Sequence, residues 1–189
     1  MILFDREIKK LCEEEGMIVP FVSEKVRLYH KEPVVSYGLD SFGYDIRLSG
    51  RDFKLICGWN PAEPLDIKNI VGDDYQNLEH DENFVVLPPH NCMLAVSLEK
   101  FTIPFDVIGV CMGKSTYARA GILVNVTPLE PGWQGFLTLE IANLSYRPIK
   151  LYINEGIAKI MFYRGDQPSS SYGFGKYQNQ QSNIQLPRM

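Results

Sequence analysis

The sequence lacks the hydrophobic runs that membrane insertion and export require. Its 189 residues contain no apolar stretch near the roughly 18–20 residues that span a bilayer. The N-terminal segment MILFDREIKKLCEEEG turns acidic after four residues, so it has no apolar core of a secretory signal peptide. We therefore expect a cytoplasmic protein that has no membrane partner.

The sequence also lacks an excess of basic residues. Lysine and arginine number 19 against 23 aspartates and glutamates, which gives a formal net charge of −4. Dedicated nucleic-acid-binding proteins usually carry a basic excess, so we expect no nucleic-acid partner. The chain is 45% apolar and 12% aromatic, so it can still bury a core, which argues against wholesale disorder.

Cysteine is scarce and never occurs as a CxxC pair. The four cysteines are Cys12, Cys57, Cys92 and Cys111. In a cytoplasmic chain these wide spacings favour neither a disulfide framework nor a zinc cage. We interpret the four thiols as small buried apolar side chains.

Helical periodicity is equally scarce. One helix is expected near the N-terminus, with Asp5 as its cap, Ile8, Leu11 and Cys12 at helical spacing, and Gly16 at its end. Short runs rich in β-branched and aromatic residues follow, separated by turn residues. The expected strands cover residues 44–48, 53–57, 84–87, 92–98, 107–112, 122–127, 136–141, 149–153 and 157–163. This pattern predicts an all-β sandwich, jelly roll or barrel, and the length favours a single domain over residues 1–189.

Two polar segments interrupt the strand pattern. Residues 59–83 have the composition of a long surface excursion. The tail over residues 165–189 contains SSSYGFGKYQNQQSN and few aliphatic side chains. Such a tail is either disordered or, because it combines glycine hinges with Lys, Tyr and Gln, a flexible lid that closes over a ligand.

The segment Gly113–Gly121, GKSTYARAG, carries the densest polar chemistry. We expect one helical turn, with Ser115 as its N-cap and Gly121 as its stop. The free N–H groups of that turn, the Lys114 charge and the Thr116 hydroxyl would suit an anion. Ser115 and Arg119 stand four residues apart and would face one pocket. The alternative is an ordinary decorated loop, and the GxxxxGK[ST] spacing of a P-loop is absent.

A second element is the strand at residues 136–141, FLTLEI. Alternation places Thr138 and Glu140 on one face and the aliphatic side chains on the other. A carboxyl in so apolar a strand would have a raised pKa, which suits a proton shuttle. The alternative is a structural ion pair between Glu140 and Arg119 or Arg147. The turn at 126–135 between these elements either walls a pocket or merely links strands.

Taken in order, three stretches resemble the dCTP deaminase family, which is related to the dUTPases. They are YGLDSFGYDIRL, GKSTYARAGILVNVTPLEPGWQGFLTLEIAN and GKYQNQ, and the likeness runs over nearly the whole chain. The resemblance implies a distorted β-barrel or jelly-roll-like subunit with a short N-terminal helix and few others. It also implies a homotrimer whose active sites lie between subunits, and hydrolytic deamination of dCTP to dUTP and ammonia.

The resemblance assigns Glu140 as the catalytic proton shuttle, with Ser115 and Arg119 positioning the attacking water. The other implied contacts fall in the 114–119 run, near the sugar, along the base and on the tail. The implied substrate-binding residues are Lys114, Ser115, Thr116, Tyr117, Ala118, Arg119, Glu130, Thr138, Leu139, Glu140, Lys159, Tyr172, Lys176 and Gln180. The chain departs from the family at Lys159, where a glutamine is usual, and in a shorter segment between Tyr172 and Lys176.

The resemblance and the residues together indicate chemistry without a protein-bound metal. Zinc deaminases carry HxE and PCxxC signatures. His30-Lys31-Glu32 spells HxE, but PCxxC is missing, so we interpret His30 as a surface residue and expect no zinc. Mg²⁺ would come bound to the triphosphate itself. The alternatives are a bifunctional enzyme that continues to dUMP, a variant acting on dCMP or a modified deoxycytidine nucleotide, and a non-catalytic trimeric binding module.

Overall fold

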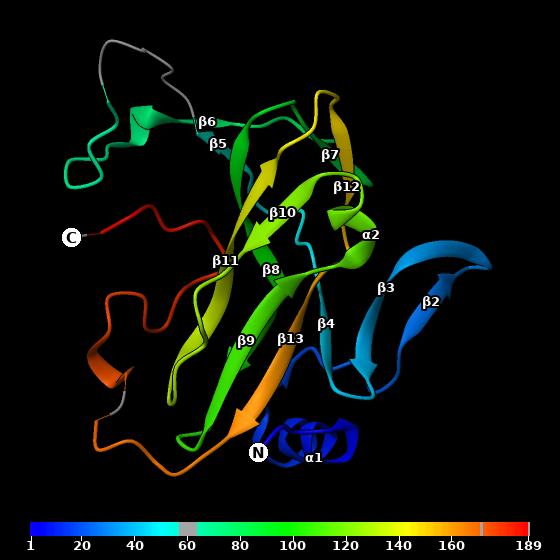
Figure 1. Cartoon of the computed structure of the whole chain (residues 1–189), viewed down its shortest axis with the longest axis vertical. Helices are drawn as coiled ribbons and strands as arrows, with labels where there is room; N and C mark the ends of the chain where they lie inside the picture. The colour runs from blue at the N-terminus through cyan, green and yellow to red at the C-terminus, as the bar shows by residue number, and fades with distance from the viewer. Residues whose placement is uncertain (57–63, 171, 189) are drawn as a thin grey trace.

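The computed structural model describes residues 1–56, 64–170 and 172–188. Two antiparallel sheets enclose the core, and a short ribbon extends it (Figure 1). In spatial order, the first sheet contains β10 (Ile122–Asn125), β11 (Gln134–Asn143), β8 (Cys92–Thr102), β5 (Lys54–Ile56) and β6 (Tyr75–Asn77), with β1 (Ile18–Val19) beside β8. The second contains β2 (Val26–Tyr29), β3 (Glu32–Asp40), β4 (Gly43–Arg47), β13 (Gly156–Arg164) and β9 (Val107–Gly113). The ribbon pairs β7 (Phe84–Leu87) with β12 (Ile149–Tyr152).

This arrangement confirms the expected all-β, jelly-roll-like class, although the sheets do not close into a barrel. The two sheets meet where Leu48 bridges to Ser97 beyond the end of β4. There the Arg47 Nε donates to the fully buried Glu99 at 2.7 Å. A buried charge needs such a partner, so this pair fixes β4 against β8.

The N-terminal helix α1 spans Asp5–Glu15 and buries Ile8, Leu11 and Cys12, as the periodicity predicts. Its cap differs from the prediction by one residue. Phe4 is the extended N-cap residue, and its N–H donates to the Glu7 carboxylate at 3.2 Å. Asp5 is therefore the first helical residue and not the cap. Gly16 ends the helix in the left-handed region with φ of 67°.

All nine expected strands occur among the described residues, eight of them with shifted ends and β7 as predicted, although Cys57 of the expected 53–57 strand lies outside those residues. Four described strands were not expected: β1, β2, β3 and β6. β6 and the 3₁₀ turn η1 (Gly72–Asp74) lie inside the predicted surface excursion, so this segment partly joins the first sheet. Its residues 59–63 lie outside the described residues. His30 is exposed in the turn between β2 and β3, as expected.

The three described cysteines are free thiols, while Cys57 lies outside the described residues. Cys12 is buried, and its burial raises the pKa to about 12. Cys92 and Cys111 are only partly buried, so the expectation of buried thiols holds fully for Cys12 alone. In the described ranges, no helix is long and apolar enough to cross a bilayer.

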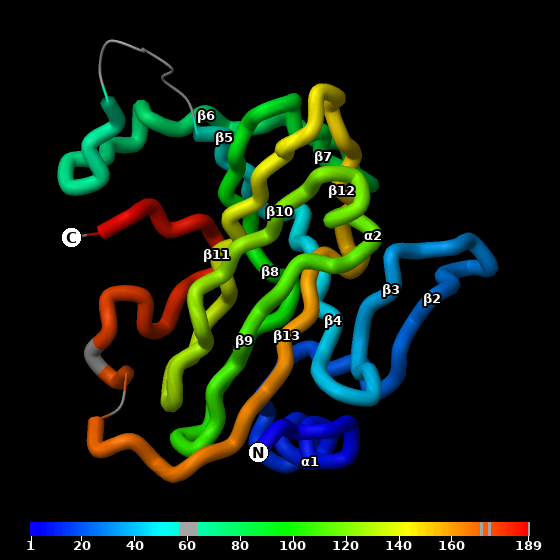
Figure 2. The backbone as a smooth tube through the Cα atoms, in the orientation of Figure 1, coloured from blue at the N-terminus to red at the C-terminus, as the bar shows by residue number. Residues whose placement is uncertain are grey.

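The tail returns to the first sheet after leaving β13. Its course is visible in Figure 2, where the C-terminal segment runs back toward β11. A parallel bridge joins Gly135 to Gln180, and the Phe136 N–H donates to the Gln180 carbonyl at 3.0 Å. The 3₁₀ turn η2 (Tyr172–Phe174) precedes this contact. The tail thus adds a wall beside β11.

Candidate active site

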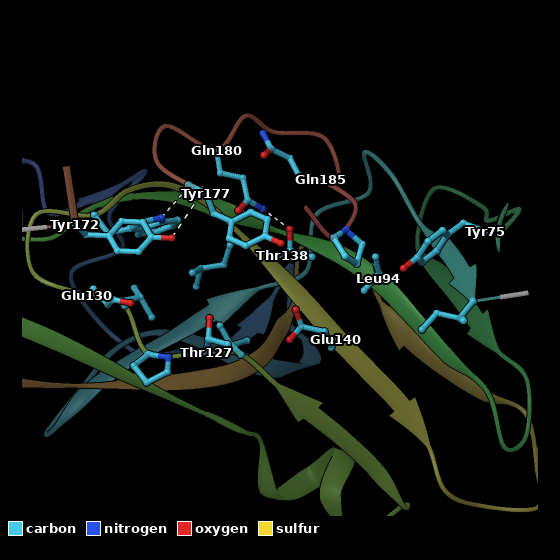
Figure 3. A pocket seen from close by; sticks show the side chains of 17 residues that line it. Tyr75, Leu94, Thr127, Glu130, Thr138, Glu140, Tyr172, Tyr177, Gln180 and Gln185 are labelled. Carbon is cyan, nitrogen blue, oxygen red and sulfur yellow. Dashed lines mark hydrogen bonds between the residues drawn. The ribbon is translucent and has the colours of Figure 1, made fainter. Parts of the chain in front are cut away.

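A cavity of about 370 Å³ opens between β11, the 126–133 turn and the tail. Figure 3 shows its polar side chains converging from these three elements. Among the residues that line it are Thr127, Glu130, Trp133, Thr138, Glu140, Tyr172, Tyr177 and Gln180. The turn therefore walls a pocket, which settles one alternative left open by its sequence. Trp133 anchors the tail there, because its Nε1 donates to the Tyr177 carbonyl at 2.9 Å.

Glu140 projects into this cavity from β11. The strand alternates as predicted: Leu137, Leu139 and Ile141 are buried, while Thr138 and Glu140 are half-buried on the other face. Burial raises the pKa of the Glu140 carboxyl above its usual range, although a 3.4 Å hydrogen bond donated by Asn125 Nδ2 opposes this rise.

Asn125 lies directly opposite Glu140 in the β10–β11 register. The structural alternative, an ion pair of Glu140 with Arg119 or Arg147, does not occur in the part of the chain that the structure describes. The carboxyl is thus half-desolvated without a counter-ion among the described residues, and this environment favours its neutral form more than water does.

Thr138 and Leu139 flank the carboxyl but differ in orientation. The Thr138 hydroxyl faces the cavity and accepts a hydrogen bond from Gln180 Nε2. Leu139 is fully buried in the core, so only its backbone is available to a ligand. Gln180 itself is 5% exposed, and it connects the tail to the residue two positions before Glu140.

The remaining predicted tail residues behave differently from one another. Tyr172 lines the cavity, and its hydroxyl lies 3.4 Å from the Tyr177 N–H, which donates to it. Lys176 is exposed and does not line the cavity; its Nζ donates to the Arg188 carbonyl at 3.4 Å. Glu130 lines the cavity from an exposed position on the turn. The mobility expected for this tail stays a prediction.

The polar segment after β9 forms α2 (Ser115–Ala118), one helical turn as predicted. Its N-cap position is Lys114 and not Ser115, because the extended backbone ends one residue earlier than expected. The Arg119 Nη1 donates to the Ser115 carbonyl at 3.1 Å, so the two residues lie close together on this turn. Ser115, Thr116, Ala118 and Arg119 are exposed.

Tyr117 supports this turn and is not part of its exposed face. It is 5% exposed, and its hydroxyl accepts the Tyr152 N–H at 3.0 Å. Burial raises its pKa to about 12. None of residues 114–119 lines the Glu140 cavity. One chain therefore does not bring Ser115 and Arg119 to Glu140.

Lys114 and Lys159, both among the implied substrate-binding residues, do come together. The Lys114 Nζ lies 2.7 Å from Asp45 Oδ2, and the Lys159 Nζ lies 3.8 Å from Asp45 Oδ1. Gly156 makes this approach possible, because a Cβ there would lie 2.0 Å from the Ser36 carbonyl oxygen and 3.1 Å from Lys114 Cδ.

Several residues in the cavity, and Asn125 beside it, were not predicted from the sequence. Asn125 could have been found from the expected hairpin between residues 122–127 and 136–141, which places it near the carboxyl. Tyr177 lies inside the quoted GKYQNQ stretch. Tyr75, Leu94 and Gln185 also line the cavity, and no local pattern marks them, since they come from distant parts of the chain.

A half-buried carboxyl in a partly apolar cavity of an all-β fold is the arrangement expected of an enzyme that moves protons on a small organic substrate. The dCTP deaminase-like family matches residues 2–165, and the chain belongs to that family.

Proteins named dCTP deaminase are similar over nearly their whole length. The relative from Acidobacterium capsulatum is 49% identical, over 93% of this chain and 92% of its own. The one from Herpetosiphon aurantiacus is 45% identical, over 98% of this chain and 97% of its own. The solved dCTP deaminase of Agrobacterium tumefaciens shares the fold, with a TM-score of 0.61 at 18% identity over 87% of this chain and 46% of that chain.

Proposed function

We propose that this enzyme deaminates dCTP hydrolytically, giving dUTP and ammonia. The observation that carries this function is the half-buried Glu140 in the cavity beside Thr138, without a counter-ion in the described part of the chain. Relatives that are 42–49% identical over most of their length are named dCTP deaminase. The strand β11, which carries Glu140, lies inside residues 2–165 that match the dCTP deaminase-like family.

Glu140 serves each proton transfer in turn. The carboxylate takes a proton from water as the water oxygen bonds to C4 of the cytosine, and the proton passes to N3. The C4–N bond of the tetrahedral intermediate then breaks, and the second proton of the water goes to the leaving amine as ammonia. A pKa raised by burial brings the carboxyl closer to the operating pH, where such exchange is fastest.

The other cavity residues orient the substrate in this proposal. Thr138 and the Leu139 backbone face the base, Glu130 the sugar, and Tyr172 and Gln180 close the site from the tail. Lys176 would join them only after a rearrangement, because its side chain now points away from the cavity.

Ser115 and Arg119 enter the site from a neighbouring subunit of a homotrimer. Their exposure outside the cavity of their own chain supports this arrangement. Exposed apolar side chains on β9 and β10, the strands before and after α2, support it too. Ile108 is 41% exposed, Met112 57% and Leu123 54%. Burial of such side chains between copies is favourable. In the trimer, Arg119 and Ser115 would orient the attacking water beside Glu140.

The reaction as proposed uses no zinc and no other protein-bound cofactor. The support is the missing PCxxC signature and a carboxyl placed to move the protons directly. Mg²⁺ travels with the triphosphate oxygens of the substrate. Because the substrate is a free nucleotide, we place the enzyme in the cytoplasm, with neither a nucleic acid nor a membrane as partner.

The test is ammonia release from dCTP, dCMP, CTP and dUTP, with chromatography of the nucleotide products. We expect ammonia and dUTP in equal amounts from dCTP. Formation of dUMP and pyrophosphate would identify a bifunctional enzyme. A faster reaction with dCMP than with dCTP would identify dCMP as the preferred substrate. The Glu140→Gln variant is the negative control. If wild type releases ammonia from dCTP no faster than this variant does, the function is refuted.

A further inference from the structure

Five charged side chains from separate elements converge outside the Glu140 cavity. Lys25 precedes β2, Asp40 ends β3, Asp45 lies on β4, Lys114 follows β9 and Lys159 lies on β13. We call these five residues the lysine cluster. Asp45 and Lys159 are direct cross-strand partners in the β4–β13 register, which fixes the cluster to the sheet.

The contacts within the lysine cluster are short. Asp40 Oδ2 lies 2.5 Å from both the Lys25 Nζ and the Lys159 Nζ. Asp45 Oδ2 lies 2.7 Å from the Lys114 Nζ and 3.4 Å from the Lys25 Nζ. Asp45 is fully buried, so its charge must be balanced by its neighbours.

The lysine cluster carries more positive than negative charge. Three ammonium groups meet two carboxylates, which leaves a formal surplus of one positive charge. Each ammonium has three N–H groups. Within the described residues, contacts of hydrogen-bond length to protein groups use two of those on Lys114, two on Lys25 and one on Lys159. The unused donors and the surplus charge together suit an anion.

The lysine cluster is also placed to receive a ligand. The side chains of Lys25, Lys159 and Asp40 are 21–23% exposed, and that of Lys114 is 10% exposed. A solute can therefore reach the ammonium groups, while their partial burial weakens competition from water and salt. Lys114 directly precedes Ser115 and Arg119, which the proposed trimer brings to a neighbour's Glu140.

We infer that Lys25 binds the polyphosphate end of the nucleotide together with Lys114 and Lys159. Asp40 limits the net positive charge that these three lysines present to the phosphates. The inference rests on the proposed function. Lys25 donates to the phosphate oxygens directly, whereas Asp40 is a positioning residue that holds Lys25 and Lys159 side by side. The partial compensation by Asp40 and Asp45 keeps three like charges together without a ligand.

Two substitutions change the charge of the lysine cluster in opposite directions. Lys25→Gln lowers the surplus from +1 to 0, and Asp40→Asn raises it to +2. If electrostatic attraction governs binding, Lys25→Gln weakens and Asp40→Asn tightens the binding of inorganic tripolyphosphate, each roughly tenfold at low salt and less at high salt. If the lysine cluster is only a brace for the sheet, both variants lose affinity or neither changes.

The assay is isothermal titration of the folded protein with inorganic tripolyphosphate, repeated as competitive inhibition of dCTP turnover. Lys9→Gln is the matched control, because Lys9 also pairs with a carboxylate, at 3.8 Å from Glu13 on α1, and its loss changes the net charge equally. The inference is supported if the two cluster variants shift the affinity for tripolyphosphate in opposite directions and Lys9→Gln leaves it unchanged. Any other pattern overturns it.

If Lys25→Gln does not fold, Asp40→Asn decides alone, and anything but tighter binding by that variant rejects the inference. The titration measures binding without turnover. A result against the lysine cluster therefore remains distinguishable from a result against dCTP deamination.

Discussion

Replacing Glu140 by glutamine keeps the size of the side chain and removes its ability to carry a proton. General acid–base catalysis contributes roughly 10²–10⁴-fold to a rate, which corresponds to about 3–5 kcal/mol of barrier. We expect kcat for dCTP to fall by at least the lower figure, while the Kd for dCTP changes little because the amide still fills the same place on β11. Steady-state ammonia release and equilibrium binding of dCTP measure the two quantities separately.

The same substitution should stabilise the folded protein at pH 7, although it slows catalysis. Burial raises the pKa of Glu140 in the native state, so the favourable contribution of this carboxyl to stability is complete below the pKa of the unfolded chain, near 4.3. That contribution is lost as pH rises through the raised native pKa. At pH 7 the fold of the wild type therefore opposes the ionisation of this carboxyl, a cost in stability that the variant lacks. We expect Glu140→Gln to unfold at a higher denaturant concentration than wild type at pH 7, with the difference disappearing near pH 4.

Glu130→Gln is the matched control, since Glu130 is a second carboxyl on the same cavity but is exposed. It should raise KM without a large fall in kcat and without the pH-dependent gain in stability. A Glu140→Gln enzyme that keeps a tenth of wild-type turnover would show that Glu140 is not the shuttle. An unfolding midpoint equal to that of wild type at both pH values would show that the carboxyl is not desolvated.

Three further predictions concern the tail, the metal and the core. Truncation after Tyr172 removes the cavity wall held by Gln180 and should raise KM or abolish activity, while the core still melts cooperatively; an equally active truncated enzyme would contradict the lid. Dialysis against a strong chelator followed by Mg²⁺ alone should restore full activity, and a requirement for added Zn²⁺ would reopen the mechanism. Asn143→Leu should lose about 3 kcal/mol of unfolding free energy in chemical denaturation, because the buried Asn143 side chain makes five hydrogen bonds; a loss below about 1 kcal/mol would mean that water replaces them.

The strands of the core were predictable because each buries one apolar face. The hairpin of β2 and β3 was not, for two physical reasons. Its residues are mostly exposed or half-buried, and Pro33 within β3 argues against a central strand. Its turn uses His30 and Lys31 at positive φ of 48° and 71°, where the usual signals are glycine and asparagine.

The half-buried position of Glu140 was predictable from alternation alone, because an acid between Leu139 and Ile141 stands out in an apolar strand. The lysine cluster was not, since its members lie up to 134 residues apart and meet only through the β3–β4 and β13–β4 registers. Pairing partners in a sheet are set by long-range register. The sequence therefore pointed to Lys114 through its polar segment and to Lys159 through the family resemblance, without indicating that Asp45 joins them.

The separation of Glu140 from the lysine cluster has an electrostatic reason. A cation within about 4–6 Å of a carboxyl lowers its pKa, and the lysine cluster does this to Asp40, whose pKa lies well below its ordinary value, with Lys159 and Lys25 opposing the effect of burial. The same lysines beside Glu140 would hold it as a carboxylate and prevent it from returning protons to the base and the leaving amine. The cations lie on the β3–β4–β13 sheet and Glu140 lies on β11, so the two environments stay apart. In the proposed trimer, a chain with a net charge of −4 would then bind a polyanion at one end of the substrate and move protons at the other.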